Sequence, residues 1–452
     1  MGDYDVIVVG AGIAGLAAGA LLAHDGKKVL LLEKDNQIGG RAKTIYYNGH
    51  IIDNGPHGFS RAGFLEEIYE RLNIPFPERF VMWASRSETF KDGRWSDMRE
   101  LYSPKELKRI MNEYVARASY EDLRKLDDVP LKSWVKHITD NEGIHLVFWY
   151  LGQALCPNTN FDQISAGETL YFIKEHLDRG KLLGEMGSVL KGALKNLTGP
   201  LADYIEKKGG KVRNSIRVVD VITDKGKVRG VRAEVGEKVF SSQLLYPDRI
   251  MAPIVIVAVP LWEIFRIIPE EEFPAWYADM IRRIQYHVSY IWSIICGLER
   301  PLWDENSLRW IPRLKKTGFE FFSCCFPEYG AQVLQFQVHF LMQANYSELP
   351  NLFHYSQASI RRKIENMFGL FEEEVNSLYP ELQEITQWKI RHAAAYSIAQ
   401  SPGSVGDSRP PMEVPGIENL YLIGDTIREA RGMGMQAAGR AAMDCVEKIL
   451  RK

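Results

Sequence analysis

Three glycines close to the N-terminus have the spacing of a phosphate-binding turn. Gly10, Gly12 and Gly15 follow the pattern GxGxxG directly after a short run of apolar residues. In such a turn the first glycine lets the chain leave a strand sharply, the second lets the backbone approach a pyrophosphate, and the third lets a helix pack closely. Because a glycine pattern alone is a weak signal, its meaning depends on the elements that surround it.

The surrounding elements are those that a dinucleotide-binding turn requires. The apolar residues 6–9 predict a buried parallel strand, residues 13–24 predict a helix, and residues 28–32 predict a second strand. The free N–H groups and the positive dipole end of the helix would then face the phosphates. The second strand ends at Glu33, about 20 residues past the turn, where a carboxylate can accept hydrogen bonds from a ribose diol. The order of these elements therefore predicts dinucleotide binding.

A further motif follows the acidic strand end. Gly39-Gly40-Arg41 comes shortly after Glu33. Together with the glycine turn, it resembles the start of the superfamily of flavin-containing amine oxidases, phytoene desaturases and protoporphyrinogen oxidases. The resemblance implies that the nucleotide is FAD and that Arg41 lies beside the pyrophosphate and the flavin. The glycine spacing by itself indicates only a dinucleotide.

A second segment resembles the part of the superfamily that holds the adenine. Residues 217–223 and 228–235 predict the two strands of a hairpin. The resemblance implies that a valine of the first strand contacts the adenine through its backbone. Val218 is the predicted residue, and Val219 is the alternative if the register is shifted by one residue.

A third segment lies near the C-terminus. Gly424-Asp425 follows a predicted strand, and the resemblance implies that Asp425 hydrogen-bonds to the ribityl or pyrophosphate part of FAD. Gly432 and Gly434 precede a predicted helix at residues 435–450, and they would let the isoalloxazine approach. The N-terminus of that helix would stabilise negative charge at the N1–C2=O2 edge of the flavin.

Three such segments in this order imply an α/β fold, with a discontinuous Rossmann-type FAD-binding domain and a mixed α+β substrate domain. The FAD-binding domain is predicted at residues 1–61, 187–261 and 386–452, and the substrate domain at residues 62–186 and 262–385. The residues predicted to contact the cofactor are Gly10, Gly12, Ile13, Ala14, Gly15, Glu33, Lys34, Gly40, Arg41, Gly55, Pro56, Val218, Gly424, Asp425, Gly434, Met435 and Gln436.

Three residues are candidates for chemistry beside the flavin. Amine oxidases of the superfamily usually carry a lysine two residues before the proline of a KxPxxW motif, whereas the corresponding position here is Glu299. This departure counts against oxygen-dependent amine oxidation. His57 lies in a loop that passes near the flavin in the superfamily. Arg428, with Arg431, would pair with an anionic group of the substrate or of FAD, or would be a solvated loop residue.

The attachment of FAD is predicted to be non-covalent. Some amine oxidases tether the flavin through a cysteine shortly before the final Gly-Asp motif, but residues 392–401 contain none. Tyr396, in the same segment, is either one wall of an aromatic cage for an amine or a core aromatic residue.

The C-terminal segment is most similar to the phytoene desaturase-like branch. That resemblance implies an FAD-dependent oxidoreductase that acts on CH–CH bonds of an apolar substrate, which would be an isoprenoid, carotenoid, terpene or alicyclic compound. Desaturation, saturation or isomerisation would proceed by hydride transfer to or from flavin N5. The alternative is a flavin amine or amino-acid oxidase. Rab GDP-dissociation inhibitors share the fold without FAD, but the intact glycines and acids argue against that class.

Composition limits the partners. The chain of 452 residues is 46% hydrophobic and 25% charged, with a net charge of −2, so it lacks the basic surplus of a nucleic-acid-binding protein. Its five cysteines have no zinc-ligand spacing, which predicts reduced thiols and no metal site. The first strand begins so early that we expect no cleaved signal and a cytoplasmic location. The expected partners are the apolar substrate and an electron acceptor that the residues do not identify.

Two local patterns add further expectations. Ser103 to Glu106 and Ser165 to Glu168 are capping boxes that predict helix starts. An apolar substrate also suggests peripheral contact with the inner face of a membrane. An ordinary surface loop would explain the same residues, which are Leu302, Trp303, Trp310 and Ile311 beside Arg309, Arg313, Lys315 and Lys316.

Overall fold

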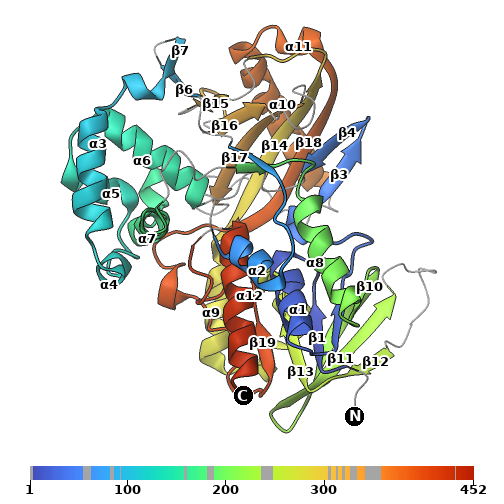
Figure 1. The fold of residues 1–452 in the computed structure, drawn as a ribbon. Coiled ribbons are helices and arrows are strands. Elements are labelled where there is room, and N and C mark those ends of the chain that lie inside the picture. The colour runs from blue at the N-terminus through green and yellow to red at the C-terminus, as the bar shows by residue number, and fades with distance from the viewer. Residues whose placement is uncertain are drawn as a thin grey trace.

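The computed structural model describes most of the chain. The described residues are 4–53, 63–81, 86–91, 93–156, 160–180, 188–235, 248–303, 307–311, 314–317, 321–325, 333–341, 358–432 and 434–452. Both termini lie at the lower end of the molecule in Figure 1, next to a parallel sheet, while a second, larger sheet lies above it and a group of helices lies to one side.

The parallel sheet has five strands and confirms the predicted α/β class. In spatial order, the strands are β19 (Leu420–Leu422), β13 (Ile254–Val257), β1 (Val6–Val9), β2 (Val29–Leu32) and β9 (Lys211–Arg213). All four neighbouring pairs are parallel, so the carboxyl ends of the strands share one edge. The central strands are fully buried, as their unbroken apolar sequences require.

Helices cover this sheet. The helix α1 (Ile13–His24) has eleven buried residues out of twelve and packs against α12 (Gly434–Leu450) and α8 (Lys195–Lys207). The short helix α2 (Phe64–Leu72) packs against α12 and α1. The small side chains of α1 allow these close contacts, so the helix is buried on nearly every side.

A three-stranded antiparallel sheet flanks the parallel sheet. It consists of β10 (Ile216–Asp224), β11 (Lys227–Val235) and β12 (Asp248–Met251), with β10 at its edge. Lys225 and Gly226 form the predicted turn with φ angles of 50° and 73°. The pairing of β10 shifts between Val218 and Asp220, which places Val219 in a β-bulge.

The larger sheet has seven strands. In spatial order, they are β18 (Thr386–Ile398), β14 (Val288–Leu298), β17 (Val333–Leu341), β16 (Phe321–Cys325), β15 (Ser307–Ile311), β6 (Arg86–Lys91) and β7 (Arg94–Asp97). All eleven residues of β14 are buried. The segment from residue 386 onward, which was assigned to the FAD-binding domain, thus contributes β18 to this sheet and β19 to the parallel sheet.

The remaining elements are a group of helices, called the helical lobe, and several helices and strand pairs outside it. The helical lobe beside the large sheet in Figure 1 contains α3 (Pro104–Ile110), α4 (Tyr120–Arg124), α5 (Leu131–Ile138), α6 (Glu142–Leu155) and α7 (Ala166–Asp178). Outside it lie α9 (Ala275–Tyr286), α10 (Ala358–Leu378), α11 (Leu382–Ile385) and the strand pairs β3 (Thr44–Tyr47) with β4 (His50–Asp53) and β5 (Arg79–Val81) with β8 (Ser188–Leu190). Across the described residues, every helix is too short or too polar to span a bilayer.

Candidate cofactor site

The glycine turn lies at the carboxyl edge of the parallel sheet, and each glycine has a different surrounding. Gly10 has a φ of +103°, and its N–H donates to the Leu32 carbonyl over 2.8 Å. A Cβ on Gly15 would lie 2.0 Å from the Gly10 oxygen, so the third glycine permits the close approach of α1. A Cβ on Gly12 would meet nothing within 4 Å. The fold therefore requires Gly15, while the open side of Gly12 is where a pyrophosphate would approach.

Glu33 holds the glycine turn in place. Its carboxylate is only 5% exposed, and Oε2 accepts a hydrogen bond of 2.7 Å from the Ala11 N–H. Oε1 accepts a second bond of 2.9 Å from the Asp35 N–H. Since each carboxylate oxygen has two lone pairs, both bonds leave capacity for a ribose diol, and that role stays a prediction.

The Gly39-Gly40-Arg41 motif packs directly on the turn. The Gly39 N–H donates to the Ala11 carbonyl over 2.8 Å, and a Cβ on Gly40 would lie 3.2 Å from the Gly12 Cα. This contact brings Arg41 to the end of β19, where it forms a bidentate ion pair with Asp425.

Asp425 is the most densely partnered carboxylate at this edge. Its Oδ1 lies 2.6 Å from Arg41 Nη2, and its Oδ2 accepts bonds of 3.0 Å from Arg41 Nη1 and 2.8 Å from Ser397 Oγ. Burial by itself would raise the pKa of Asp425, but Arg41, Ser397 and Arg409 together lower it below its ordinary value. Asp425 therefore stays ionised. Ser397, on β18, is a site residue that sequence reasoning missed.

Val218 has its backbone on the edge of β10 that faces Glu33. The Ile216 N–H donates to the Glu33 carbonyl over 2.8 Å, so that edge of β10 adjoins the end of β2. Backbone groups two residues apart on a strand point to the same side. Val218 precedes the bulge, so its backbone shares this edge. The position is compatible with the predicted adenine contact.

The last predicted contacts lie at the start of α12. Gly424 has a φ of +136°, and a Cβ there would meet nothing within 4 Å. Met435 and Gln436 are buried. Gln436 accepts a bond of 2.9 Å from the Leu65 N–H and donates to Glu66 over 3.2 Å, so its side chain binds the N-terminus of α2. The Gln436 side chain is therefore engaged at α2.

These features fit a dinucleotide. The N-cap of α1 is Gly12, which offers no side-chain acceptor to the first turn of the helix. Those N–H groups, the open faces of Gly12 and Gly424, and the half-buried Arg41 guanidinium can together receive a pyrophosphate. Ile13 and Ala14 are buried in this first turn, whereas Lys34 is exposed.

Of the three residues predicted to do chemistry, the structure describes Glu299 and Arg428, and it brings neither of them to this site. Glu299 is exposed and follows the end of β14 opposite to Ser289, which pairs with Ser397. At about 3.3 Å per residue, roughly 30 Å of strand separates Glu299 from that pair. Glu299 is therefore corrected to a surface residue remote from the predicted flavin position.

Arg428 also points away from the site. Its guanidinium contacts Asp407, with Nε 3.4 Å from Oδ1, and that carboxylate is 98% exposed. Its interpretation as a loop arginine is therefore the better one. His57, Gly55 and Pro56 lie outside the described residues, as does the side chain of Tyr396.

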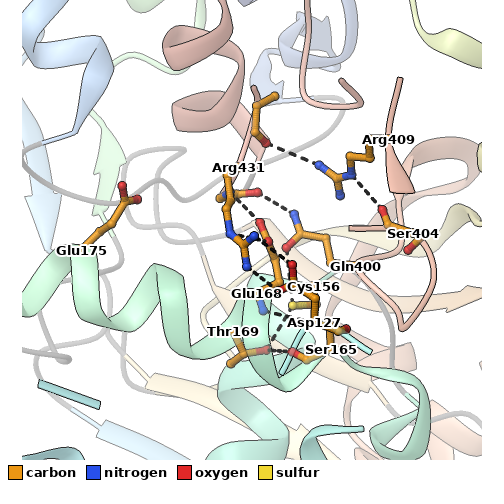
Figure 2. Close-up of polar contacts among 12 residues, drawn as sticks. Asp127, Cys156, Ser165, Glu168, Thr169, Glu175, Gln400, Ser404, Arg409 and Arg431 are labelled. Atoms are coloured by element: carbon orange, nitrogen blue, oxygen red, sulfur yellow. Dashed lines mark hydrogen bonds and ion pairs between the residues drawn. The ribbon is translucent and has the colours of Figure 1, made fainter. Parts of the chain in front are cut away.

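Arg431, unlike Arg428, is buried in a polar cluster between α7 and the loop before α12 (Figure 2). Its guanidinium makes a bidentate ion pair with Asp127, and its Nε lies 3.2 Å from Glu168 Oε2. It also lies over the Tyr171 ring at 4.3 Å. The partner of Arg431 is therefore the protein, not an anionic ligand or bulk water.

The predicted membrane-facing segment is also different in the structure. Trp303 and Trp310 are 9% and 4% exposed. The Arg309 guanidinium lies 4.4 Å from the Trp303 ring centroid and 2.9 Å from the Glu88 carboxylate. Both tryptophans are thus core residues, and this segment cannot present them to a membrane. Arg313 and the side chain of Ile311 lie outside the described residues.

One cavity of about 370 Å³ lies between β6 and helices α5 and α6. Its wall is mainly apolar and includes Phe90, Leu146, Trp149 and Phe161. Ser397 lies on β18, five strand spacings from β6, so the cavity is roughly 24 Å across the sheet from Ser397. It is therefore separate from the cofactor site.

Comparison with known proteins agrees with this geometry. Residues 13–450 match the family model described as flavin containing amine oxidoreductase. The chain is 25% identical over 275 residues to the 4,4'-diapophytoene desaturase of Methylomonas sp, which covers 53% of this chain and 52% of that protein. It is 57% identical over 131 residues to the inactive all-trans-retinol 13,14-reductase of Danio rerio, covering 28% of this chain and 21% of that protein. The matched regions thus span about half, or less, of the length of these curated relatives.

Solved structures share the fold over the whole chain. An oxidoreductase from Methanosarcina mazei superposes with a TM-score of 0.73 at 17% identity, covering 98% of this chain and all of that one. Putrescine oxidase bound to putrescine superposes with a TM-score of 0.66 at 16% identity, covering 99% of both chains. At these identities the superpositions show a common fold and say nothing about the substrate.

Proposed function

Because the chain belongs to the family of flavin containing amine oxidoreductases, we propose that it is an FAD-dependent oxidoreductase of CH–CH bonds in an apolar isoprenoid or polyene. Desaturation, saturation and isomerisation all belong to this class. The named relatives support it, since one is a diapophytoene desaturase and another, with 47% identity over 88 residues, is the human all-trans-retinol 13,14-reductase. That human match covers 19% of this chain and 14% of that protein, so the substrate is a proposal.

The observation that carries this proposal is the state of the buried acids. A cationic amine that leaves water needs a carboxylate or a comparable partner to offset the loss of hydration. In the part of the chain that the structure describes, each buried carboxylate is already engaged by an arginine, a hydroxyl or a backbone N–H. These acids are Glu33, Asp53, Glu88, Glu168, Glu374 and Asp425. An uncharged substrate does not need an anionic partner when it is buried.

A substrate in contact with the large sheet would meet an apolar strand next to the cofactor site. The strand β14 is buried along its whole length, and its Ser289 pairs with Ser397, which donates to Asp425. A substrate on this sheet would therefore be held at a constant distance from the cofactor. Burial of its carbon skeleton would contribute about 25 cal/mol per Å² of apolar surface.

Bound FAD would supply the redox chemistry, by accepting or returning a hydride at flavin N5. The chain's own residues bind and orient the cofactor through the glycine turn, Arg41 and Asp425. They also shield the Asp425 carboxylate from water, since its side chain is 5% exposed. The described part of the site places no titratable side chain in an unpaired position suited to proton transfer from an amine.

Anaerobic titration of the purified flavoprotein tests the proposal. Terpenes, carotenoids, retinoids and amines are added in turn to the oxidised protein, and the flavin absorbance is followed. Polyenes are added separately to the dithionite-reduced protein. We expect bleaching or reoxidation with an apolar compound and none with amines. Bleaching by amines alone would instead identify an amine or amino-acid oxidase. A protein that fails to take up FAD would contradict both activities.

A further inference from the structure

The loop that joins β19 to α12, residues 425–432, is held from outside by three buried polar side chains. These are Glu168 on α7 and Gln400 and Arg409 from the segment after β18, and their exposed fractions are 1%, 3% and 1%. We call them the loop clamp. Figure 2 shows the cluster between the helical lobe and the start of α12.

The clamp holds the loop mainly through its backbone groups, and Glu168 also pairs with the loop side chain of Arg431. The Gly432 N–H donates to Glu168 Oε1 over 2.6 Å, and Gln400 Nε2 donates to the Gly432 carbonyl over 2.6 Å. At the other end, Arg409 Nη1 donates to the carbonyls of Asp425 and Ala430 over 3.2 Å and 3.4 Å. Both ends of the loop are therefore fixed, including the peptide just before the N-terminus of α12.

Glu168 is free to reach the loop because its expected helix-capping role is taken over. Ser165 Oγ accepts from the Glu168 N–H over 3.2 Å, as predicted for a capping box. The Ser165 N–H, which the carboxylate would normally bind, donates instead to the Gln400 carbonyl over 2.8 Å. The same contact ties α7 to the segment that carries Gln400.

Further contacts orient the clamp. Cys156 Sγ lies 3.6 Å from Gln400 Oε1 and 3.3 Å from Thr169 Oγ1. Burial raises the pKa of Cys156 to about 12, so it remains a thiol that can donate to the amide oxygen. Arg431 pairs with Glu168 and Asp127, which balances the buried charge of the carboxylate.

We propose that Glu168, Gln400 and Arg409 are positioning residues through which the helical lobe sets the affinity and the redox potential of bound FAD. Gly432 and Gly434 have φ angles of +105° and +51° and no side chains of their own to hold this conformation. The loop carries Asp425 at one end and the N-terminus of α12 at the other. Displacing it would move both contacts away from the cofactor. The inference rests on FAD binding and is independent of the proposed substrate.

A competing explanation is that the clamp residues only hold α7 against α12 and have no specific effect on the loop. The chain contains a matched control for this explanation. Glu175 lies on the same helix as Glu168 and forms an ion pair with Arg440 of α12, so it also joins α7 to α12. Its hydrogen bond goes to Arg440, which lies outside the loop. A general loosening of the two helices would therefore appear in both Glu175→Gln and the clamp variants.

The test compares Gln400→Leu, Glu168→Leu and Glu168→Gln with Glu175→Gln. FAD affinity is measured by titration of each apoprotein, the potential by spectroelectrochemistry, and apoprotein stability by urea unfolding. We expect Gln400→Leu and Glu168→Leu to weaken FAD binding by tenfold or more. The potential of the bound flavin should become more negative in Gln400→Leu, since the α12 amides then stabilise the reduced flavin less. Glu168→Gln keeps an acceptor for Gly432 and should lose less affinity than Glu168→Leu.

The control should unfold more easily but bind FAD within twofold of the wild type. If Gln400→Leu does not fold, Gln400→Asn keeps a buried amide but withdraws it from Gly432, and the same loss of affinity is expected. FAD affinity and potential within error of the wild type in the folded clamp variants would overturn the proposal. An equal loss of affinity in Glu175→Gln would overturn it too.

Discussion

Two arginine–carboxylate groups lie at opposite ends of the loop formed by residues 425–432, and they have different roles. Arg41 binds Asp425 at the end that faces the glycine turn, while Arg431 binds Asp127 and Glu168 at the end that faces the helical lobe. The Arg41 side chain is 34% exposed and that of Arg431 only 7%. A guanidinium that is one-third exposed can still be reached by a phosphate, whereas the buried guanidinium of Arg431 lies between two carboxylates and an aromatic ring and stabilises the structure.

The two groups also differ in the direction of the pKa shift of their aspartates. Burial alone would raise the pKa of Asp425, but Arg41, Ser397 and Arg409 together lower it. Burial raises the pKa of Asp127, and the ion pair with Arg431 offsets only part of that effect. The two pKa shifts are therefore opposite, because burial outweighs Arg431 at Asp127, whereas Arg41, Ser397 and Arg409 together outweigh burial at Asp425.

The largest expected effect is at the glycine turn on the Arg41 side, where one substitution should impair folding and another should impair only cofactor binding. Gly15→Val would place side-chain atoms against the Gly10 carbonyl and should lower the free energy of unfolding by about 3 kcal/mol or more. Gly12→Val has open space and should leave the apoprotein folded but unable to bind FAD. Urea unfolding and flavin absorbance measure the two effects. Tight FAD binding by Gly12→Val would show that the pyrophosphate lies elsewhere.

The next effect concerns stability. Arg431→Met leaves the buried Glu168 and the half-buried Asp127 without their arginine and should destabilise the protein by about 3–5 kcal/mol. Arg41→Met should cost about 1–2 kcal/mol, because water reaches its guanidinium and Ser397 remains bound to Asp425. Chemical denaturation of both apoproteins provides the measurement. Equal losses of unfolding free energy in the two variants would contradict the distinction between a partly exposed and a buried arginine.

A smaller effect concerns FAD affinity. Asp425→Asn keeps the size of the side chain but removes the charge that holds Arg41, so FAD binding should weaken by about tenfold, or 1.4 kcal/mol. Asp127→Asn, on the lobe side, should weaken it by less than about threefold, because Glu168 still accompanies Arg431. Fluorescence titration with FAD decides between them, and the reverse order of effects would contradict the assignment of the two sides.

The smallest effect is on the pH dependence of stability. The lowered pKa of Asp425 means that its contribution is complete above its ordinary value of 3.8 and is lost as the pH falls through the folded pKa. For Asp127 the raised pKa reverses the sign, so its contribution is greatest below 3.8 and is lost as the pH rises through the folded pKa. Unfolding free energies from about pH 2.5 to pH 6 should therefore show a shallower rise in Asp425→Asn and a steeper one in Asp127→Asn. Parallel changes in the two variants would refute the opposite shifts.

The cofactor turn could be predicted from sequence because its steric requirements concern residues that are close together in the chain. The spacing of Gly10, Gly12 and Gly15 states which backbone positions must lack a Cβ, and Glu33 follows at the end of the next strand. The Ser165 cap was predictable for the same reason. Glu299 was misplaced because a motif resemblance states the order of residues along the chain but not where a long strand carries them.

Residues of the loop clamp carried no such signal. Glu168 and Gly432 are 264 residues apart, and Ser397 reaches Asp425 only because β18 joins the large sheet next to β14. Arg409 in a polar loop is indistinguishable from a solvated arginine until its burial is known. The one usable hint was Arg431, an unexpected charge in a glycine-rich segment.

The sequence by itself thus determined the cofactor turn, the class of the fold and the family. These depend on steric and hydrogen-bonding requirements between residues that are close in the chain. Only the tertiary structure decided which arginine stays open to a ligand and which is enclosed, and which side chains hold the loop before α12. Those outcomes depend on how the helical lobe and the two sheets pack together, and that packing joins groups that no local pattern connects.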